Sequence, residues 1–136
     1  MTDEYRLDDQ VGYKLRLASQ RHLEIFSQHL SDITPTQFSI LARLYEVGET
    51  SQNQLGRLVA MDAATTKGVI TRLLDKHLVE ARADPNDARR LQISLTEAGR
   101  ELTIDAIEKA RRITEDTVAN LNGRDMKRLL ELLDKI

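Results

Sequence analysis

The chain contains no cysteine among its 136 residues. Disulfide bonds, thiolate redox sensing and zinc sites built on cysteine are therefore excluded. Apolar runs approaching the roughly 18 residues of a membrane-crossing helix are also missing. The N-terminal sequence MTDEYRLDDQ lacks the basic and then apolar pattern of a secretory signal. We therefore expect a cytoplasmic protein.

A large excess of basic charge, which would mark the whole chain as a nucleic-acid binder, is absent too. The formal net charge is -2 at pH 7, with 20 Lys and Arg against 22 Asp and Glu. Basic side chains outnumber acidic ones only in residues 51–100, and residues 51–60 contain no acidic side chain. This bias is weak evidence for DNA binding, so a prediction of DNA binding has to rest on the sequence motifs.

Spacings that would support catalysis or a metal site are lacking as well. The three histidines, His22, His29 and His77, are scattered, and no serine or carboxylate surrounds them at motif spacing. His22 and His29 lie seven residues apart on one face of a predicted helix, but they have no third His or Cys to complete a metal site. We expect a protein that is not an enzyme and that holds no metal and no cofactor.

Helix starts and ends are easy to locate in this sequence. Apolar residues at helical spacing predict a first helix over about residues 8–30. Thr34-Pro35-Thr36-Gln37 has the form of a capping box, and it opens a second helix that ends at Gly48. Low-complexity segments, repeats and Gly/Ser linkers are absent, so we expect one domain or two tightly joined halves.

The C-terminal part of the chain is predicted to form two more helices. Thr96 caps a long helix that runs to about residue 119, and Asn122 to Asp125 separate it from a last helix. The last helix carries an unusually heavy apolar load: Met126, Leu129, Leu130, Leu132, Leu133 and Ile136. This load either folds back on the chain's own core or forms a subunit interface, and the sequence leaves both alternatives open.

The middle of the chain has the pattern of a winged helix-turn-helix. Ser51-Gln52-Asn53-Gln54 is a second capping box that opens a short helix, and Asp62 caps a longer one over about residues 63–77. About three residues separate these helices, which is the spacing of a helix-turn-helix. Two predicted strands follow, Val79 to Arg82 and Leu91 to Leu95, so the stretch DPNDARR between them forms the tip of a hairpin.

Two adjacent arginines, Arg89 and Arg90, are predicted to lie at this hairpin tip. In a winged helix-turn-helix the second helix enters the major groove, and the hairpin lies over a minor groove whose negative potential attracts guanidinium groups. Asp87 can hold the Arg89 guanidinium by a charge-assisted hydrogen bond. A plain solvated turn would also explain Asp, Pro and Asn here, but the position directly after a helix-turn-helix favours a wing.

The whole pattern resembles the MarR family of bacterial transcription regulators. The resemblance rests on the helix SQNQLGRL, the helix MDAATTKGVITRLLDKHLV, the wing DPNDARRLQISLT with Asp87-Ala88-Arg89 as the family's D-x-R, and Leu95-Thr96-Glu97-Ala98-Gly99 as its L-T-x-x-G. It covers nearly the whole chain. Two positions depart from the family pattern, because His77 stands where glycine is usual and Gly68 where a larger polar residue is common.

The resemblance implies a mainly α fold with a small β-hairpin wing. It divides the chain into an N-terminal dimerisation helix (1–33), a winged helix-turn-helix (34–96) and C-terminal dimerisation helices (97–136). It further implies a homodimer that binds a pseudo-palindromic operator in double-stranded DNA and represses nearby genes until a small aromatic carboxylate releases it. The competing hypothesis is a helical protein-interaction module with no role in DNA binding.

Polar residues near the start of the predicted recognition helix are candidates for base contacts, and the neighbouring alanines can touch a thymine methyl. Arg72 either contacts a phosphate or pairs with Asp75. Gln52 and Asn53 either bind a phosphate together with free backbone N–H groups or are simply solvated. Gly68 costs about 1 kcal/mol of helix propensity relative to alanine but would let the backbone approach DNA. The predicted DNA-binding residues are Gln52, Asn53, Ala63, Ala64, Thr65, Thr66, Lys67, Arg72, Asp87, Arg89 and Arg90.

The first helix also carries a candidate effector site in the stretch LRLASQRH. The stretch is similar to that of family members in which an Arg and a His six residues apart contact an aromatic carboxylate, and the match gives Arg16 and His22. In the family the pocket lies between the dimerisation helices and the winged domain. Six helical positions separate two side chains by about 120° and about 9 Å, so this pair converges only if the pocket straddles the helix or uses both subunits. Otherwise Arg16 makes a surface ion pair and His22 a hydrogen bond in an interface.

Overall fold

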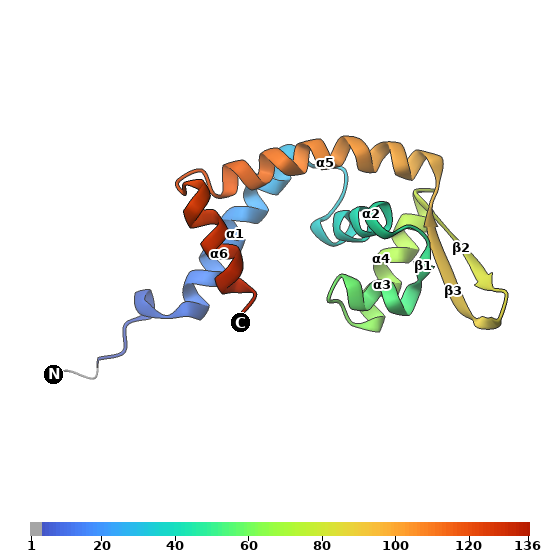
Figure 1. Cartoon of the computed structure of the whole chain (residues 1–136), viewed down its shortest axis with the longest axis horizontal. Helices are drawn as coiled ribbons and strands as arrows, with labels where there is room; N and C mark the ends of the chain where they lie inside the picture. Colours follow the sequence, from blue (N-terminus) through green and yellow to red (C-terminus); the bar gives the residue numbers. More distant parts are fainter. Residues whose placement is uncertain (1–3) are drawn as a thin grey trace. The chain divides into compact units, whose positions relative to one another are not determined.

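The computed structural model describes residues 4–136, and in that range it contains six α-helices and a small antiparallel sheet (Figure 1). This confirms the predicted mainly α fold with a hairpin wing. The helices are α1 (Val11–His29), α2 (Pro35–Val47), α3 (Gln52–Leu58), α4 (Ala63–Asp75), α5 (Glu97–Thr117) and α6 (Gly123–Leu133), with a single 3-10 turn (Leu7–Asp9) before α1. The strands are β1 (Thr50–Ser51), β2 (Val79–Asp84) and β3 (Asp87–Leu95).

The chain divides into two compact units. One contains the residues up to His29 together with Ala110–Ile136, and the other is Leu30–Lys109. The second unit holds α2, α3, α4 and the sheet, and we call it the winged unit. The first holds α1, α6 and the last part of α5, and we call it the helical unit. None of the described helices is both long and apolar enough to span a lipid bilayer.

The helix starts of the winged unit follow the predicted caps. The Thr34 side chain accepts the backbone N–H of Gln37 at 3.1 Å, and the Gln37 side chain returns a bond to the Thr34 backbone at 3.3 Å, which completes the capping box. Asp62 accepts the backbone N–H of Thr65 at 2.7 Å and caps α4. Both caps are short-range features, so the local sequence is sufficient to predict them.

The predicted box at the start of α3 is only half formed. Ser51 accepts the backbone N–H of Gln54 at 3.2 Å, as a cap should. The Gln54 side chain does not return the bond, because its Oε1 accepts two bonds from the Arg57 guanidinium at 2.9 and 2.7 Å. A charged donor makes a stronger hydrogen bond than a neutral one, so the Gln54 oxygen binds the Arg57 guanidinium and not the Ser51 backbone N–H.

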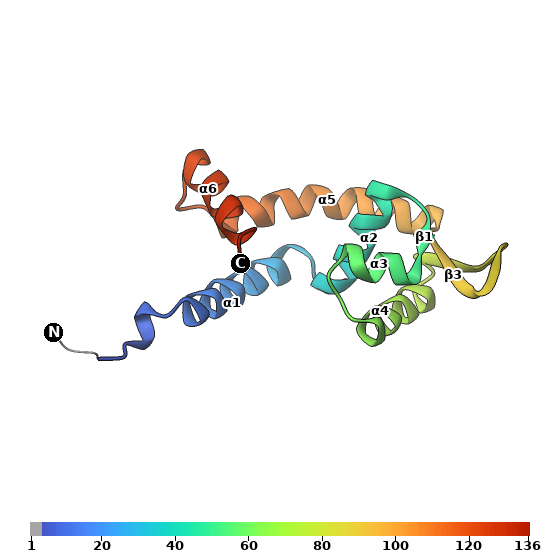
Figure 2. The ribbon, with the colours of Figure 1, turned by 60° about the horizontal axis from the view of Figure 1, so that its bottom comes forward.

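The core of the winged unit lies where α2, α3 and α4 pack against one another and against the sheet. The helices α3 and α4 lie side by side in both views (Figures 1 and 2), and α4 presents Val69 and Leu73 to the core. Burying each such side chain contributes roughly 1.5–3 kcal/mol. The fully buried aliphatic side chains of this unit are Ile40, Leu41, Leu55, Ile70, Leu73 and Ile93.

The sheet differs from the predicted hairpin in two ways. It has a third strand, because β1 pairs with β3 and the strand order is β1-β3-β2. The hairpin strands are also longer than predicted, and only Pro85 and Asn86 remain between them. A two-residue strand such as β1 carries no periodic signal, so it becomes visible only through its pairing with β3.

The residues of the predicted hairpin tip, Asp84 to Arg90, lie beyond the last regular pair of the two strands. Along β2 and β3 the pairing is regular up to Ala83 opposite Leu91, and the next pair is Asp84 opposite Asp87. One residue along β2, from Ala83 to Asp84, thus corresponds to four residues along β3, from Leu91 to Asp87. Ala88, Arg89 and Arg90 therefore have no partners on β2 and form a bulge. A bulge bends the strand and changes the direction of its side chains, and this one places both arginines in an irregular segment next to the two-residue turn.

The junction between α4, β2 and α5 explains the L-T-x-x-G motif. Thr96 donates its backbone N–H to Leu78 O at 3.1 Å and its hydroxyl to His77 O at 2.7 Å. Thr96 also caps α5 by accepting the Gly99 N–H at 2.9 Å. A Cβ on Gly99 would lie 1.8 Å from Leu78 O, so no other residue fits here without a shift of backbone. His77 has a φ of 59°, the left-handed conformation that glycine adopts most easily.

In the helical unit, α1 and the last part of α5 are joined by polar bonds and a small apolar core. Ile25, Phe26 and Ile113 are buried. His22 and His29 of α1 make hydrogen bonds to Thr117 at 2.9 Å and to Asp116 at 2.8 Å. The helix α6 has no buried residue, although one of its faces is apolar. A single copy of the chain therefore leaves the α6 face uncovered.

Candidate DNA interface and effector site

The start of α4 displays most of the residues predicted to contact bases. Ala63, Ala64, Thr65 and Lys67 are all exposed in the first five residues of the helix. The Asp62 carboxylate lies just before them, and its hydrogen bonds from Thr65, the backbone N–H first and then the side chain, lower the pKa of Asp62. The carboxylate therefore stays ionised and keeps the cap in place at neutral pH.

Thr66 is the exception, and its prediction as a base contact is wrong. The side chain is only 1% exposed, and its hydroxyl donates to Asp62 O at 2.8 Å. It lies against α3, where a Cβ built on Gly56 would come within 2.8 Å of the Thr66 hydroxyl oxygen. Thr66 therefore helps to hold the two helices of the helix-turn-helix together. Its position, three residues before the buried Val69, is the signal that could have placed it on the inner face.

The structure brings the start of α3 close to the wing. Gln52 and Asn53, the predicted phosphate contacts, line a small hollow together with Arg89 and Arg90. The hollow combines amide side chains with two guanidinium groups, and both groups suit the oxygens of a phosphate. The sequence placed these residues more than thirty positions apart, and only the pairing of β1 with β3 brings them together.

The predicted contact between Asp87 and Arg89 is confirmed. Asp87 Oδ1 accepts the Arg89 backbone N–H at 3.0 Å and its Nε–H at 3.3 Å. The Arg89 side chain remains 93% exposed. Its two terminal nitrogens make no hydrogen bond to any other residue in the described range. The carboxylate therefore restrains the base of the guanidinium and leaves its outer edge free.

A second charged pair in the wing was not predicted. Arg82 of β2 donates from its guanidinium to both carboxylate oxygens of Glu49, at 2.8 and 2.6 Å. The hydrogen bonds and the charge of Glu49 raise the pKa of Arg82. This two-bond fork ties the wing to the segment before β1 and occupies the Arg82 charge. The residues are 33 positions apart, so no local pattern announces the pair.

The remaining predicted DNA residue, Arg72, is exposed on α4. Within residues 4–136 it makes no ion pair with Asp75 or with any other acid. Of its two predicted roles, the structural ion pair therefore finds no support. Lys67, one and a half turns earlier on α4, is exposed as well.

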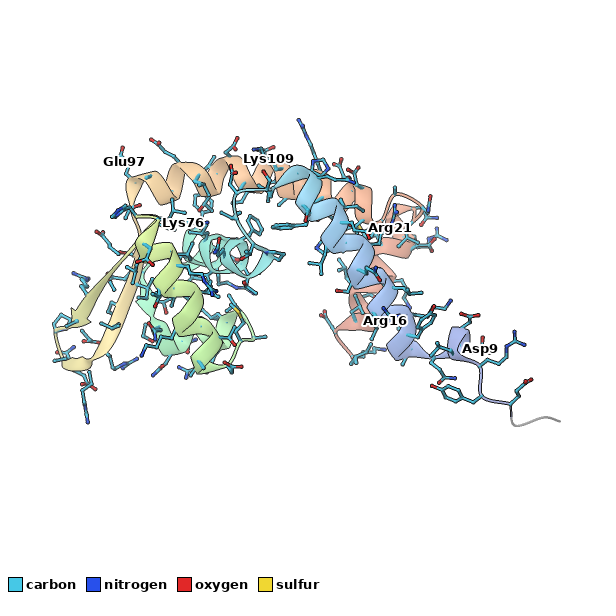
Figure 3. All side chains as sticks on the ribbon, turned by 180° about the vertical axis from the view of Figure 1, so that it is seen from behind. Asp9, Arg16, Arg21, Lys76, Glu97 and Lys109 are labelled. Carbon is cyan, nitrogen blue, oxygen red and sulfur yellow. The ribbon has the colours of Figure 1, made fainter. Side chains whose placement is uncertain are left out.

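The two residues of the candidate effector site have different surroundings in the helical unit. The Arg16 guanidinium is exposed on α1 (Figure 3), and its carbon lies 5.4 Å from the centre of the Tyr13 ring. His22 is half-buried, and its Nδ1 lies 2.9 Å from the Thr117 hydroxyl. No hydrogen bond in the described chain joins Arg16 to His22, and no ion pair there joins Arg16 to an acid. No cluster of three or more His, Asp or Glu suited to a metal ion occurs among the residues described.

Comparison with known proteins gives three close similarities. The model of the MarR family matches residues 33–91. The chain is 39% identical over 134 residues to the HTH-type transcriptional repressor NicR of Pseudomonas putida, covering 97% of this chain and 85% of NicR. It is 46% identical to a probable transcriptional regulator from Pseudomonas aeruginosa, whose crystal structure superposes with a TM-score of 0.90 over 96% of this chain and 98% of that one.

A further solved structure adds a ligand to the comparison. Bordetella bronchiseptica BpsR is 36% identical, with a TM-score of 0.93 over 97% of this chain and 96% of BpsR, and its structure concerns regulation of DNA binding by 6-hydroxynicotinic acid. The similarity to BpsR extends over both units of the fold. It therefore includes the helix α1, which carries Arg16 and His22, as well as the winged unit.

Proposed function

The chain belongs to the MarR family of DNA-binding transcription regulators, and we propose that it represses nearby genes as a homodimer until a small aromatic carboxylate releases it from its operator. Family membership makes it a regulator and not an enzyme. The observation that best supports the DNA-binding part is the display of Arg89 and Arg90 from a bulge beside the start of α3.

In this proposal α4 enters the major groove and the wing follows an adjacent minor groove. Thr65 and Lys67 read base edges, while Ala63 and Ala64 contact thymine methyl groups. Arg89 and Arg90 reach into the minor groove, where the negative potential favours guanidinium. Phosphates are bound by Gln52, Asn53 and Arg72. Two winged units related by a two-fold axis would occupy half-sites about 10–10.5 base pairs apart.

The alternative, a protein-interaction module without DNA binding, does not account for two exposed arginines placed beside the start of α3. A gel-shift titration against the upstream DNA of the chain's own gene separates the two proposals. DNA binding requires an affinity that falls steeply as salt is raised, because each neutralised phosphate releases condensed counterions. If the same titration showed no more retention of this DNA than of an unrelated fragment, the repressor proposal would be lost.

Removing the Arg89 side chain is expected to weaken operator binding by about 1–3 kcal/mol. The Arg89→Ala protein loses the exposed guanidinium but keeps the fold, because Arg89 lies in the unpaired bulge and buries nothing. Affinity for operators with altered A·T content under the wing is measured alongside. Arg43→Ala is the matched control, since it removes a partly exposed arginine of α2 that is already paired with Glu46 at 3.1 Å. Equal affinity of parent and Arg89→Ala for every operator variant would rule out a wing contact.

The effector part of the proposal rests on the charge and freedom of Arg16. Its guanidinium has no acidic partner in the described chain, and its planar fork suits a carboxylate. BpsR, similar along nearly its whole length, is regulated by a hydroxylated aromatic acid. A ligand can release DNA only if it binds the DNA-incompetent dimer more tightly than the competent one. We expect a coupling of about 1–3 kcal/mol, which corresponds to roughly 5- to 150-fold in operator affinity.

Arg16→Ala is expected to abolish the response to the effector while changing operator affinity itself little. The measurement combines calorimetric titration of hydroxylated aromatic acids with gel shifts in their presence. Arg21→Ala is the control, because Arg21 is an exposed arginine five residues along the same helix (Figure 3). An unchanged response of Arg16→Ala would exclude Arg16 from the site and would leave the repressor proposal standing.

A further inference from the structure

A chain of two short hydrogen bonds links His22 of α1 to the backbone of α5. The Nδ1 atom of His22 lies 2.9 Å from the Thr117 Oγ1, and that same oxygen lies 2.7 Å from the carbonyl oxygen of Ile113. His22 is half-buried, and Thr117 is as well. Two neighbours therefore share one hydroxyl group, which has a single hydrogen to give.

The geometry decides where that hydrogen goes. A carbonyl oxygen has no hydrogen, and two oxygens 2.7 Å apart repel unless a hydrogen lies between them. The Thr117 hydroxyl must therefore donate to Ile113 O. Toward His22 it can only accept, so the hydrogen in the second bond belongs to His22. The neutral ring then carries its proton on Nδ1 and a lone pair on Nε2.

His29 provides a contrasting case within the same protein. Its Nε2 lies 2.8 Å from Asp116 Oδ2, and an ionised carboxylate can only accept. A neutral His29 therefore carries its proton on Nε2, the opposite arrangement to His22. The two histidines lie seven residues apart on α1, and each tautomer is set by the neighbouring residue of α5, Asp116 or Thr117.

The proton arrangement at His22 restricts what its free nitrogen can bind. In the described chain Nε2 has no hydrogen-bond partner. As an acceptor it attracts an O–H or N–H group and repels the lone pairs of a carboxylate. When a bound ligand covers this acceptor without offering it a donor, the unmatched nitrogen is unfavourable, so a site built this way discriminates against ligands that bring no donor.

We propose that Thr117 is a positioning residue that holds His22 as an acceptor, so that the effector site selects aromatic carboxylates bearing a ring hydroxyl or ring N–H over those without one. The inference rests on the proposed effector function, in which Arg16 binds the carboxylate. It adds the requirement for a donor on the ring. Thr117 itself does not touch the ligand and acts through the orientation and tautomer of His22.

Nitrogen-15 NMR of the histidine side chains in the intact protein tests the tautomers without any ligand. At a pH of about 8.5, two units above the ordinary imidazole pKa, His22 should show its proton on Nδ1 and His29 on Nε2. Thr117→Val removes the acceptor and should move the His22 proton toward Nε2, while Thr117→Ser should keep it on Nδ1. A parent His22 protonated on Nε2 would overturn the proposal.

Binding of matched acids tests the selectivity. Titrating the parent with 4-hydroxybenzoate and benzoate, and with 6-hydroxynicotinate and nicotinate, should favour the donor-bearing acid of each pair by about 10- to 100-fold. Thr117→Val should reduce this preference to about 2-fold, and Thr117→Ser should restore it. Circular dichroism confirms that both variants fold.

The outcomes separate this inference from the proposed function. Equal binding of both members of each pair to the parent would overturn the selectivity and leave the aromatic-carboxylate effector in place. Binding of none of the four acids would overturn both. An unchanged preference in Thr117→Val, with the parent showing the expected one, would remove Thr117 from the explanation.

Discussion

A chain that ends at residue 120 is expected to be monomeric and to bind its operator roughly 100-fold more weakly than the full chain. The reason is the apolar face of α6, which a single copy leaves exposed. Its large side chains are Leu129, Leu130, Leu132 and Leu133, and Ile136 follows the helix. Of the two alternatives that the sequence left open, folding back onto the chain's own core receives no support from the structure.

In the proposed homodimer, covering the apolar face of α6 contributes a large part of the free energy of association. Each leucine covered by the partner contributes roughly 1.5–3 kcal/mol, and the two-fold axis counts each of them twice. In a dimer, binding of one winged unit to its half-site holds the second winged unit at a high local concentration near the other half-site. A monomer loses this advantage. That advantage is typically 10²- to 10⁴-fold, so operator binding falls even if each winged unit is intact.

Sedimentation velocity and gel shifts measure the two consequences in parallel. Because a truncation can disturb the rest of the helical unit, Leu130→Glu combined with Leu133→Glu repeats the test at full length. Glu131→Gln is the control, since it changes a charge on the same helix without adding one to the apolar face. A truncated chain that sediments as a dimer with normal operator affinity would show that α6 is not the interface.

Gly99→Ala is expected to lower the free energy of unfolding by at least about 3 kcal/mol, at the upper end of the usual overpacking effect. The added Cβ would meet the carbonyl group of Leu78, whose oxygen is 1.8 Å and whose carbon is 2.8 Å away. Backbone cannot rotate aside as a flexible side chain can. Relief requires α5 to move from the turn at His77, and that movement breaks the two bonds from Thr96 described above.

Thermal and urea unfolding give the measurement, and Gly68→Ala is the matched control. Gly68 lies inside α4 with no atom within 4 Å of a built Cβ, so alanine there should stabilise the protein by about 0.5–1 kcal/mol. The two substitutions add the same methyl group and should have effects of opposite sign. Equal midpoints for Gly99→Ala and the parent would mean that the contact with Leu78 is not tight in solution.

The helices and the wing could be predicted because their signals are local. The caps at Thr34, Asp62 and Thr96 each depend on residues within three positions. The same is true of the contact between Asp87 and Arg89. The inner faces of the helices could be predicted from the spacing of apolar residues. In α4, for example, the apolar positions indicate which face turns toward the core.

The features that sequence reasoning missed depend on pairing over long distances. The strand β1 exists only because β3 lies beside it, and the Glu49–Arg82 fork joins segments that no pattern connects. The bulge that contains Arg89 and Arg90 follows from the pairing of Asp84 with Asp87. Thr66 was misplaced because a polar residue near a helix start was assigned to the solvent face, although its hydroxyl is satisfied by Asp62 O inside the turn.

The effector site shows the same limit. The resemblance pointed to Arg16 and His22, and their assignment remains a proposal. What the sequence could not supply is the proton arrangement at His22, because Thr117 lies 95 positions away and becomes a neighbour only through the packing of α1 with α5. In our proposal the chemistry of the site therefore depends on a residue that no motif would select.

The bulge in the wing also bears on how such a regulator can acquire a new operator. Ala88, Arg89 and Arg90 take no part in the regular strand pairing and bury no core surface. Their side chains can therefore be exchanged at little thermodynamic cost, whereas Gly99 or Leu73 cannot. A library randomised at these three positions should yield mostly folded proteins with different preferences under the wing. If the wing contacts DNA as we propose, duplicated copies of such a gene can keep one scaffold and diverge in DNA preference by changing three adjacent codons.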